Sequence, residues 1–187
     1  MRTNRSAAFT TVLLLVGLTL AVTAAAADQH SGVWKMDPGR SKYSPGPPPK
    51  STTIVVIADE NGLKLKAEGT NADGSPLQLQ YDAKFDGKDY PVTGLLYADA
   101  VSVKRIDANT IESTLKKGGQ VTMIITSKVS KDGKTRTSIF KGKTAEGHDV
   151  HNVVVLEKLD MACGPRFCEK KCNGKCGNGT SCDCPKN

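Results

Sequence analysis

Apolar and polar side chains alternate with a period of two along most of the chain between residues 28 and 160. Because successive side chains of a β-strand point to opposite faces, this alternation predicts strands with one face in a core and the other in water. Ile124 interrupts the pattern in one of these runs. The runs with apolar residues at every second position are Leu63 and Leu65; Leu77, Leu79, Tyr81, Ala83 and Phe85; and Val121, Met123, Ile125 and Val129.

The last apolar run, residues 152–156, departs from simple alternation. Val153 and Val155 alternate with Val154 and Leu156, so apolar side chains occupy both faces. This pattern is typical of a strand that is buried on both sides, or nearly so.

Short polar segments containing Asn, Asp or Gly separate the apolar runs. These residues tolerate positive φ and suit the tight turns of antiparallel hairpins. No stretch shows a sustained helical period, so we expect about eight to ten strands in an antiparallel meander. Closure of the meander into an up-and-down β-barrel over residues 28–160 would remove its exposed edges. The turn segments are residues 59–62, 71–74, 86–87, 117–119 and 131–133.

A proline-rich segment, residues 44–50, interrupts the predicted meander after its first strand. It reads Ser-Pro-Gly-Pro-Pro-Pro-Lys. Proline has no N–H to donate to a sheet ladder, so we expect this segment to be extended or irregular and to lie outside the central strands.

Residues 1–27 have the features of an export signal. Arg2 and Arg5 precede an apolar stretch at residues 10–22, and residues 24–27 are all alanine, so cleavage is expected before Asp28. The apolar stretch is shorter than the ~20 residues that cross a bilayer, which favours a cleaved signal over a membrane anchor. We therefore expect a secreted protein, periplasmic or extracellular. Loss of both arginines lowers the formal net charge from +7 to +5, an excess that favours anionic surfaces.

All six cysteines lie in a C-terminal segment, residues 161–187, with the spacing C-x4-C-x3-C-x3-C-x5-C-x-C. In a secreted chain, cysteines at this density usually pair as disulfides that stabilise a segment too small for its own core. Zinc or copper thiolate binding is the alternative, and an oxidising compartment argues against it. The cysteines are Cys163, Cys168, Cys172, Cys176, Cys182 and Cys184.

The C-terminal segment is also cationic. From residue 163 to the end it holds five basic side chains against two acidic ones, a net charge of +3. This charge suits an anionic membrane surface or a cell-surface target, and nucleic acid is not expected as a partner. The basic residues are Arg166, Lys170, Lys171, Lys175 and Lys186.

Two short motifs resemble the ends of lipocalin and fatty-acid-binding barrels. Gly32-Val33-Trp34 opens the first strand, and Val-Leu-Glu-Lys at residues 155–158 lies in the last. The resemblance spans most of residues 31–158 and implies a barrel whose base is filled by Trp34 and whose lumen holds a small apolar ligand. Fatty-acid-binding proteins also have two lid helices and a late Arg-x-Tyr pair, which this sequence replaces with the proline-rich segment and a run of valines. The resemblance therefore extends to the architecture and not to a particular ligand.

Residues 34–47 resemble, in addition, an uncharacterised group of secreted bacterial proteins. Members begin Trp-Lys-x-(Asp/Asn)-Pro and continue Ser-Lys-x-Ser-Pro-Gly-Pro, as this chain does from Trp34 to Pro47. That resemblance implies secretion and no known activity.

The cysteine segment resembles the cysteine-stabilised αβ framework of defensins, and bacterial defensin-like peptides most of all. Cysteines four apart, as at Cys168 and Cys172, share a face of a helical turn, and those two apart at the C-terminus share a face of a strand. The Gly-Lys-Cys triplet at residues 174–176 matches a further element of the framework, although the helix would be little more than one turn long. Of the 15 pairings that six cysteines allow, the resemblance implies Cys168–Cys182, Cys172–Cys184 and Cys163–Cys176.

Catalytic motifs are absent from the sequence, so we expect a non-enzymatic protein without a cofactor. His148-Asp149-Val150-His151 could form a metal or base site, but its polar turn is better interpreted as solvated side chains. In the leading hypothesis the cysteine module acts on other cells as a defensin-like antimicrobial or toxin-like peptide, with the barrel as carrier or pro-domain. In the alternative, the barrel binds a small apolar ligand and the tail is a structural appendage.

Overall fold

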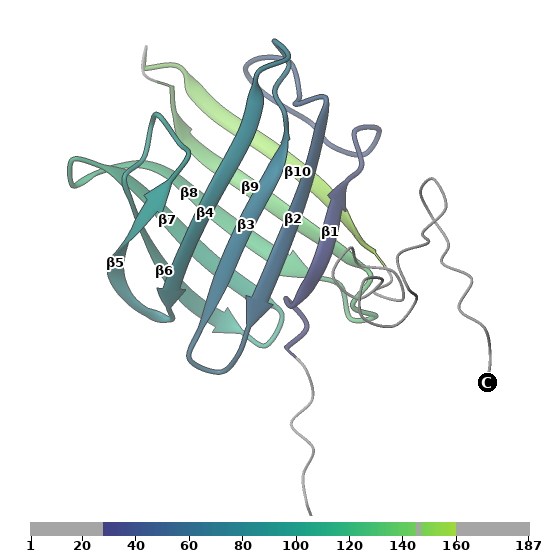
Figure 1. The fold of residues 1–187 in the computed structure, drawn as a ribbon, viewed down its shortest axis with the longest axis vertical. Coiled ribbons are helices and arrows are strands. Elements are labelled where there is room, and N and C mark those ends of the chain that lie inside the picture. Colours follow the sequence, from purple (N-terminus) through teal and green to yellow (C-terminus); the bar gives the residue numbers. More distant parts are fainter. Residues whose placement is uncertain (1–27, 145–146, 160–187) are drawn as a thin grey trace, which may run out of the picture.

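Ten β-strands run through residues 28–144 and 147–159, the parts of the chain that this computed structural model describes (Figure 1). The export signal and the six-cysteine module lie outside the described residues. No helix in the described part is long and apolar enough to cross a membrane. The strands are β1 (Gly32–Met36), β2 (Ser51–Ala58), β3 (Gly62–Thr70), β4 (Pro76–Lys84), β5 (Asp86–Thr93), β6 (Ala100–Asp107), β7 (Thr110–Lys117), β8 (Gln120–Val129), β9 (Thr135–Lys143) and β10 (Asp149–Leu159).

The strands form a closed antiparallel barrel in which each strand pairs with the next and β1 pairs with β10. The predicted antiparallel meander and its closure are therefore confirmed. Short turns dictate this order because they return the chain beside the strand it has just left. In the β7–β8 turn, Gly118 and Gly119 have φ of 54° and 81°, which side chains with a Cβ rarely adopt.

The two ends of the barrel carry different turns. The lower end in Figure 1 carries the β2–β3, β4–β5, β6–β7 and β8–β9 turns and the start of the described chain at Asp28. The upper end carries the β3–β4, β5–β6, β7–β8 and β9–β10 connections and the proline-rich segment. The position of a residue along its strand therefore shows which end of the barrel it is nearer.

The inner face of the barrel is the core that the alternation predicted. On β3, Leu63 and Leu65 are buried, whereas Lys64 and Lys66 are exposed. Outward-facing lysines find carboxylate partners on the same surface, for example Lys64 Nζ at 2.6 Å from Asp82 Oδ2. The fully or nearly fully buried apolar side chains are Trp34, Met36, Val56, Leu63, Leu65, Ala67, Ala83, Val92, Ala98, Val101, Val103, Ile111, Leu115, Met123, Val129, Val154 and Leu156.

Strand β8 corrects one detail of the sequence prediction. Val121 was expected to face the core with Met123, but its side chain is 56% exposed. The register shifts between Leu115 and Lys116 of β7, which pair with Met123 and Val121, so Thr122 has no partner in the register. A bulge of this kind inserts one residue and turns the side chains that precede it to the other face. Ile124 faces outward and is 40% exposed, as its break in the alternation indicated.

Strand β10 is less buried than the sequence predicted. Its inward-facing Val154 and Leu156 are buried, while its outward-facing Val153 and Val155 are only half-buried. The outer face of a closed barrel is in contact with solvent, and single apolar side chains are common on such a surface.

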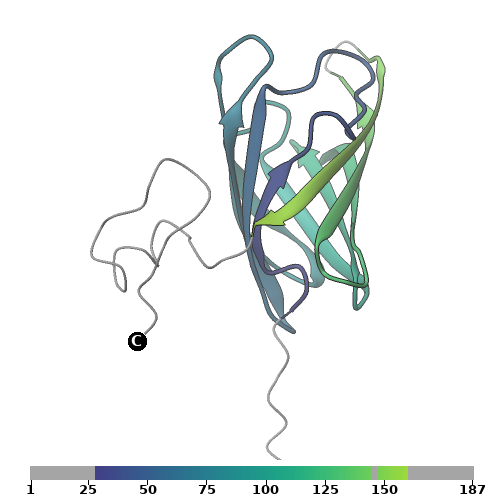
Figure 2. The same ribbon diagram turned by 90° about the vertical axis from the view of Figure 1, so that its right-hand side faces the viewer.

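Residues 37–44, which we call the strap, extend β1 along the upper part of β10 (Figure 2). Lys42 exchanges two backbone hydrogen bonds of 2.8 Å with Val153, and the Ser44 carbonyl accepts one from His151 N at 2.7 Å. These contacts provide β10 with backbone partners where β1 has already ended. The proline-rich residues then lead to β2 outside any strand, as expected.

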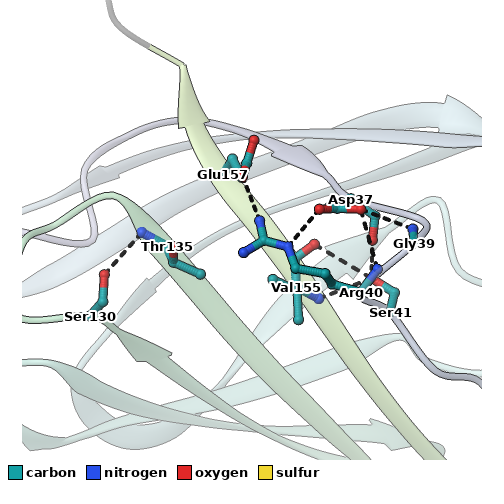
Figure 3. Close-up of polar contacts among 8 residues, drawn as sticks. All are labelled: Asp37, Gly39, Arg40, Ser41, Ser130, Thr135, Val155 and Glu157. Atoms are coloured by element: carbon teal, nitrogen blue, oxygen red, sulfur yellow. Dashed lines mark hydrogen bonds and ion pairs between the residues drawn. The ribbon is translucent and has the colours of Figure 1, made fainter.

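The start of the strap is fixed by polar side chains (Figure 3). Ser41 Oγ donates to the Asp37 carbonyl at 2.7 Å and accepts from Val155 N at 3.0 Å. Arg40 bonds Asp37 through Nε at 2.6 Å and Glu157 through Nη2 at 2.5 Å. The hydrogen bond from Arg40 holds the pKa of the Asp37 carboxyl below its usual value.

Candidate functional site

Trp34 is the one predicted site residue that the structure describes. It is fully buried and faces inward from β1, and its Nε1 donates to the His30 carbonyl at 3.0 Å. Lys158 Nζ lies 5.1 Å from the centroid of the Trp34 ring. The six cysteines and the five basic residues of the C-terminal segment lie outside the described residues.

His30 closes the lower end of the barrel beneath the strands. Its side chain is fully buried, and neither ring nitrogen has a hydrogen-bond partner in the described part of the chain. Burial lowers the pKa of His30 to about 4, with the positive charge of Arg136 acting in the same direction. The imidazole is therefore neutral at pH 7.

An ion pair flanks His30 at the same end. Arg105 Nη2 lies 2.5 Å from Asp28 Oδ2 and also donates to the Asp59 carbonyl at 2.9 Å. The Arg105 guanidinium stacks over Phe85 with 4.2 Å between its Cζ and the ring centroid. These contacts join Asp28, Asp59 and Phe85 to β6 at the lower end of the barrel.

Part of the inner face toward the upper end retains solvent exposure. Leu79 faces inward between the exposed side chains of Gln78 and Gln80, yet it is only half-buried. An inward-facing side chain that retains solvent exposure borders space that water can enter. The half-buried apolar residues that pack against the core on this inner face are Ile54, Leu77, Leu79, Tyr81, Ile125, Phe140 and Val150.

A polar group interrupts the apolar inner face between these two regions. Arg136 on β9 is 3% exposed and pairs in register with Val129 and Leu156, both of which are buried. Its Nε and Nη1 have no hydrogen-bond partner among the described residues. Burial lowers the pKa of Arg136, although a guanidinium stays protonated at any physiological pH.

Hydroxyl groups from neighbouring strands surround the same level of the barrel. Ser138, two residues after Arg136, shares a 2.8 Å hydrogen bond with Ser127 of β8, and both side chains are buried. Across the lumen, burial raises the pKa of Tyr81 on β4, while a hydrogen bond with Ser113 and the charge of Arg136 act to lower it. We call Arg136, Tyr81, Ser113, Ser127 and Ser138 the polar layer.

Two surface hollows lie at the lower end. One of about 450 Å³ is lined by residues of the β6–β7 and β8–β9 turns, including Asp107, Asn109 and Lys131. Another of about 510 Å³ is lined by Glu60, Asn61, Lys84, Phe85 and Asp86. Both are open to solvent, and neither is lined by a buried polar group without a partner, so they offer weaker recognition chemistry than the polar layer.

The remaining histidines do not form a site in the described part. His148 and His151 are both exposed, in agreement with the interpretation of their turn as solvated. Residues 28–144 and 147–159 contain no group of three or more His, Cys, Asp or Glu side chains that could hold a metal ion.

Arg136 and His30 were not singled out by the sequence as site residues. Arg136 occupies an inward position of the pattern Arg136, Ser138, Phe140, opposite outward-facing Thr137 and Ile139. Strand β9 therefore has polar side chains at two successive inner positions, 136 and 138. These polar residues were the only sign of the site in the sequence pattern. They identify a buried charge only once it is known which face of the strand points inward.

Comparison of the chain with protein-family models and with curated proteins finds no match.

Proposed function

We propose that the barrel binds a small ligand with an apolar surface inside its upper half. The observation that carries the proposal is that several inward-facing apolar side chains in the upper half retain solvent exposure. Leu77 and Leu79 on β4 and Phe140 on β9 retain solvent exposure, whereas Val101 and Leu115, toward the same end on β6 and β7, are buried. Ligand sites in barrels are concave, mainly apolar and open at one mouth. Transfer of an apolar ligand from water to these side chains would be favourable by about 25 cal/mol per Å² of apolar surface removed from water.

The entrance is also apolar. Leu96 in the β5–β6 loop is 95% exposed, and the neighbouring Tyr97 is 43% exposed, both at the upper end. Exposed apolar side chains beside an opening give an apolar ligand a first contact before it enters.

Binding of the uncharged fluorophore N-phenyl-1-naphthylamine to the purified full-length protein tests the proposal. We expect saturable binding at one site. Leu79→Trp, which adds bulk to the inner face of β4, should weaken binding at least about tenfold by occupying the same space. Gln80→Trp is the matched control, because it adds the same ring to the outer face at the next position.

No saturable binding to the folded wild-type protein would overturn the proposal. Equal effects of Leu79→Trp and Gln80→Trp would do the same, because they would place the fluorophore outside the lumen. Circular dichroism and the urea midpoint of each variant establish that the barrel is intact.

A second function is favoured by the cysteine pattern. The spacing C-x4-C-x3-C-x3-C-x5-C-x-C and the net charge of +3 at residues 163–187 support a cationic defensin-like module that acts on anionic cell surfaces. In that case the barrel is its carrier or pro-domain. The two functions are compatible in one chain, because they use different residues.

A further inference from the structure

The inference rests on the proposed lumen site and concerns the charge of its ligand. Arg136 carries a positive charge inside the barrel, and two of its guanidinium nitrogens have no hydrogen-bond partner in the described part of the chain. None of the ion pairs among the described residues involves Arg136. Buried charges in folded proteins are nearly always paired or hydrogen-bonded, since removing an ion from water is costly.

No group among the described residues neutralises the guanidinium. Asp28 contributes a favourable charge, but its carboxylate is already 2.5 Å from Arg105. Tyr81 also interacts with Arg136, yet burial raises the pKa of its hydroxyl, so it remains neutral at pH 7. The nearby Ser127 and Ser138 hydroxyls bond each other. An anionic partner for Arg136 would therefore have to come from a ligand that enters the barrel.

We propose that Arg136 binds the anionic head of a small amphiphilic organic acid, a carboxylate or sulfonate, whose apolar body extends toward the upper end. The guanidinium offers five N–H donors in a planar fork that matches the oxygens of such a head. The Tyr81 hydroxyl, on the opposite side of the lumen, supplies a further donor.

The orientation follows from the heights of the residues. Arg136 is the second residue of β9, near the lower end, with the buried Val129 and Leu156 beside it. On the same strand and face, Ser138 comes next and then the half-buried Phe140 nearer the upper end. An anion held at Arg136 therefore has hydroxyl groups next to it and apolar side chains between it and the mouth.

A pair of fluorophores that differ by one anionic group tests this directly. 1-Anilinonaphthalene-8-sulfonate has the skeleton of N-phenyl-1-naphthylamine with a sulfonate added. We expect the sulfonate to bind the wild-type protein more tightly than the uncharged compound. Arg136→Met should weaken sulfonate binding about 10- to 100-fold and change binding of the uncharged compound less than about threefold.

Lys128→Gln is the matched control. It removes one positive charge from the exposed outer face of β8. If Arg136 acts by direct contact and not through the net charge of the protein, Lys128→Gln should change neither affinity by more than about threefold.

The outcomes separate the inference from the function on which it rests. If the uncharged compound binds in the lumen, the sulfonate binds no more tightly and Arg136→Met has no selective effect, the inference is overturned and the proposed function stands. If neither compound binds the folded wild-type protein, both are overturned.

The stability of the ligand-free protein gives a second readout. Without ligand, the buried charge of Arg136 is unpaired among the described residues and destabilises the barrel. Arg136→Met should therefore have a urea midpoint equal to or above that of the wild type. A lower midpoint, or a variant that fails to fold, would show that Arg136 is a structural residue and would overturn the inference. Addition of the sulfonate should then raise the midpoint of the wild type more than that of the variant.

Discussion

His30 is a polar side chain that the barrel buries without a hydrogen-bond partner among the described residues. Burial and the charges of Arg136 and Arg105 disfavour the imidazolium, while Asp28 and Asp107 favour it more weakly. The balance keeps His30 neutral in the folded protein near pH 7. Burial of His30 lowers the stability of the fold only at acidic pH, where the unfolded chain binds a proton at this histidine and the folded chain does not.

The stability of the barrel should therefore fall as the pH decreases from about 6.5 to about 4. The usual pKa of histidine is 6.5 and the folded value is about 4, so the unfolded state binds the additional proton across this window. The difference amounts to about 3 kcal/mol at its full extent. Above pH 6.5 His30 contributes no pH dependence, because both states are then neutral.

Urea unfolding between pH 7 and pH 4 checks this expectation. His30→Gln should have a shallower pH profile than the wild type. His151→Gln, a change at an exposed position of β10, should reproduce the wild-type profile. Identical slopes for all three proteins would contradict the role assigned to His30.

At the scale of elements, the strap explains how a first strand of five residues can close a barrel against a last strand of eleven. The upper part of β10 would have unpaired backbone groups once β1 ends at Met36. The strap supplies partners for Val155, Val153 and His151 instead. Exposed strand edges promote unwanted pairing with other chains, so this contact serves solubility as well as closure.

Ser41→Ala should lower the free energy of unfolding by about 1 to 2 kcal/mol, because it leaves the Val155 N–H without its partner. Ser51→Ala, at the exposed first residue of β2, is the matched control and should change stability by less than about 0.5 kcal/mol. Chemical denaturation of both variants measures the difference. Equal stabilities would mean that water replaces the serine hydroxyl at Val155.

Elements also show where sequence patterns are reliable and where they fail. The turns at residues 71–74, 117–119 and 131–133 were predicted correctly, because each contains glycine that adopts positive φ. The inward orientation of Val121 was wrong, because a bulge depends on the register between β7 and β8. Register depends on both paired strands and cannot be predicted from the sequence of either strand alone.

At the scale of the whole molecule, the chain joins a barrel without cysteine to a segment that holds all six. If the segment is a disulfide module, the two parts respond differently to reduction. The barrel is stabilised by its core and its closed ladder, so loss of disulfides should leave it folded. The C-terminal segment has few bulky apolar residues and would depend on its crosslinks.

Intact-mass measurement of protein from the culture medium, before and after reduction, tests this division. We expect a gain of six hydrogen atoms on reduction, from three disulfides among the six cysteines. A fragment that starts near residue 160 would support a released peptide, and growth inhibition by the oxidised material but not the reduced material would support its action on cells. No gain in mass, or a bound metal, would contradict the defensin-like interpretation.

The sequence by itself determined the strand content, most of the turns and the inner face of most strands. These depend on neighbouring residues: period-two burial and the local preference of Asn, Asp and Gly for turns. It also predicts a division between the barrel and the cysteine segment, because composition changes abruptly at that point.

Only the tertiary structure decided the number of strands, the register of β8, the partner of the upper part of β10 and the position of Arg136. Each of these depends on which strands become neighbours when the sheet closes. Arg136, Tyr81 and Ser113 come from β9, β4 and β7, and nothing in their spacing along the chain indicates that they interact across a lumen. A candidate site assembled across a barrel exists only after closure, because closure is what removes its charged group from water.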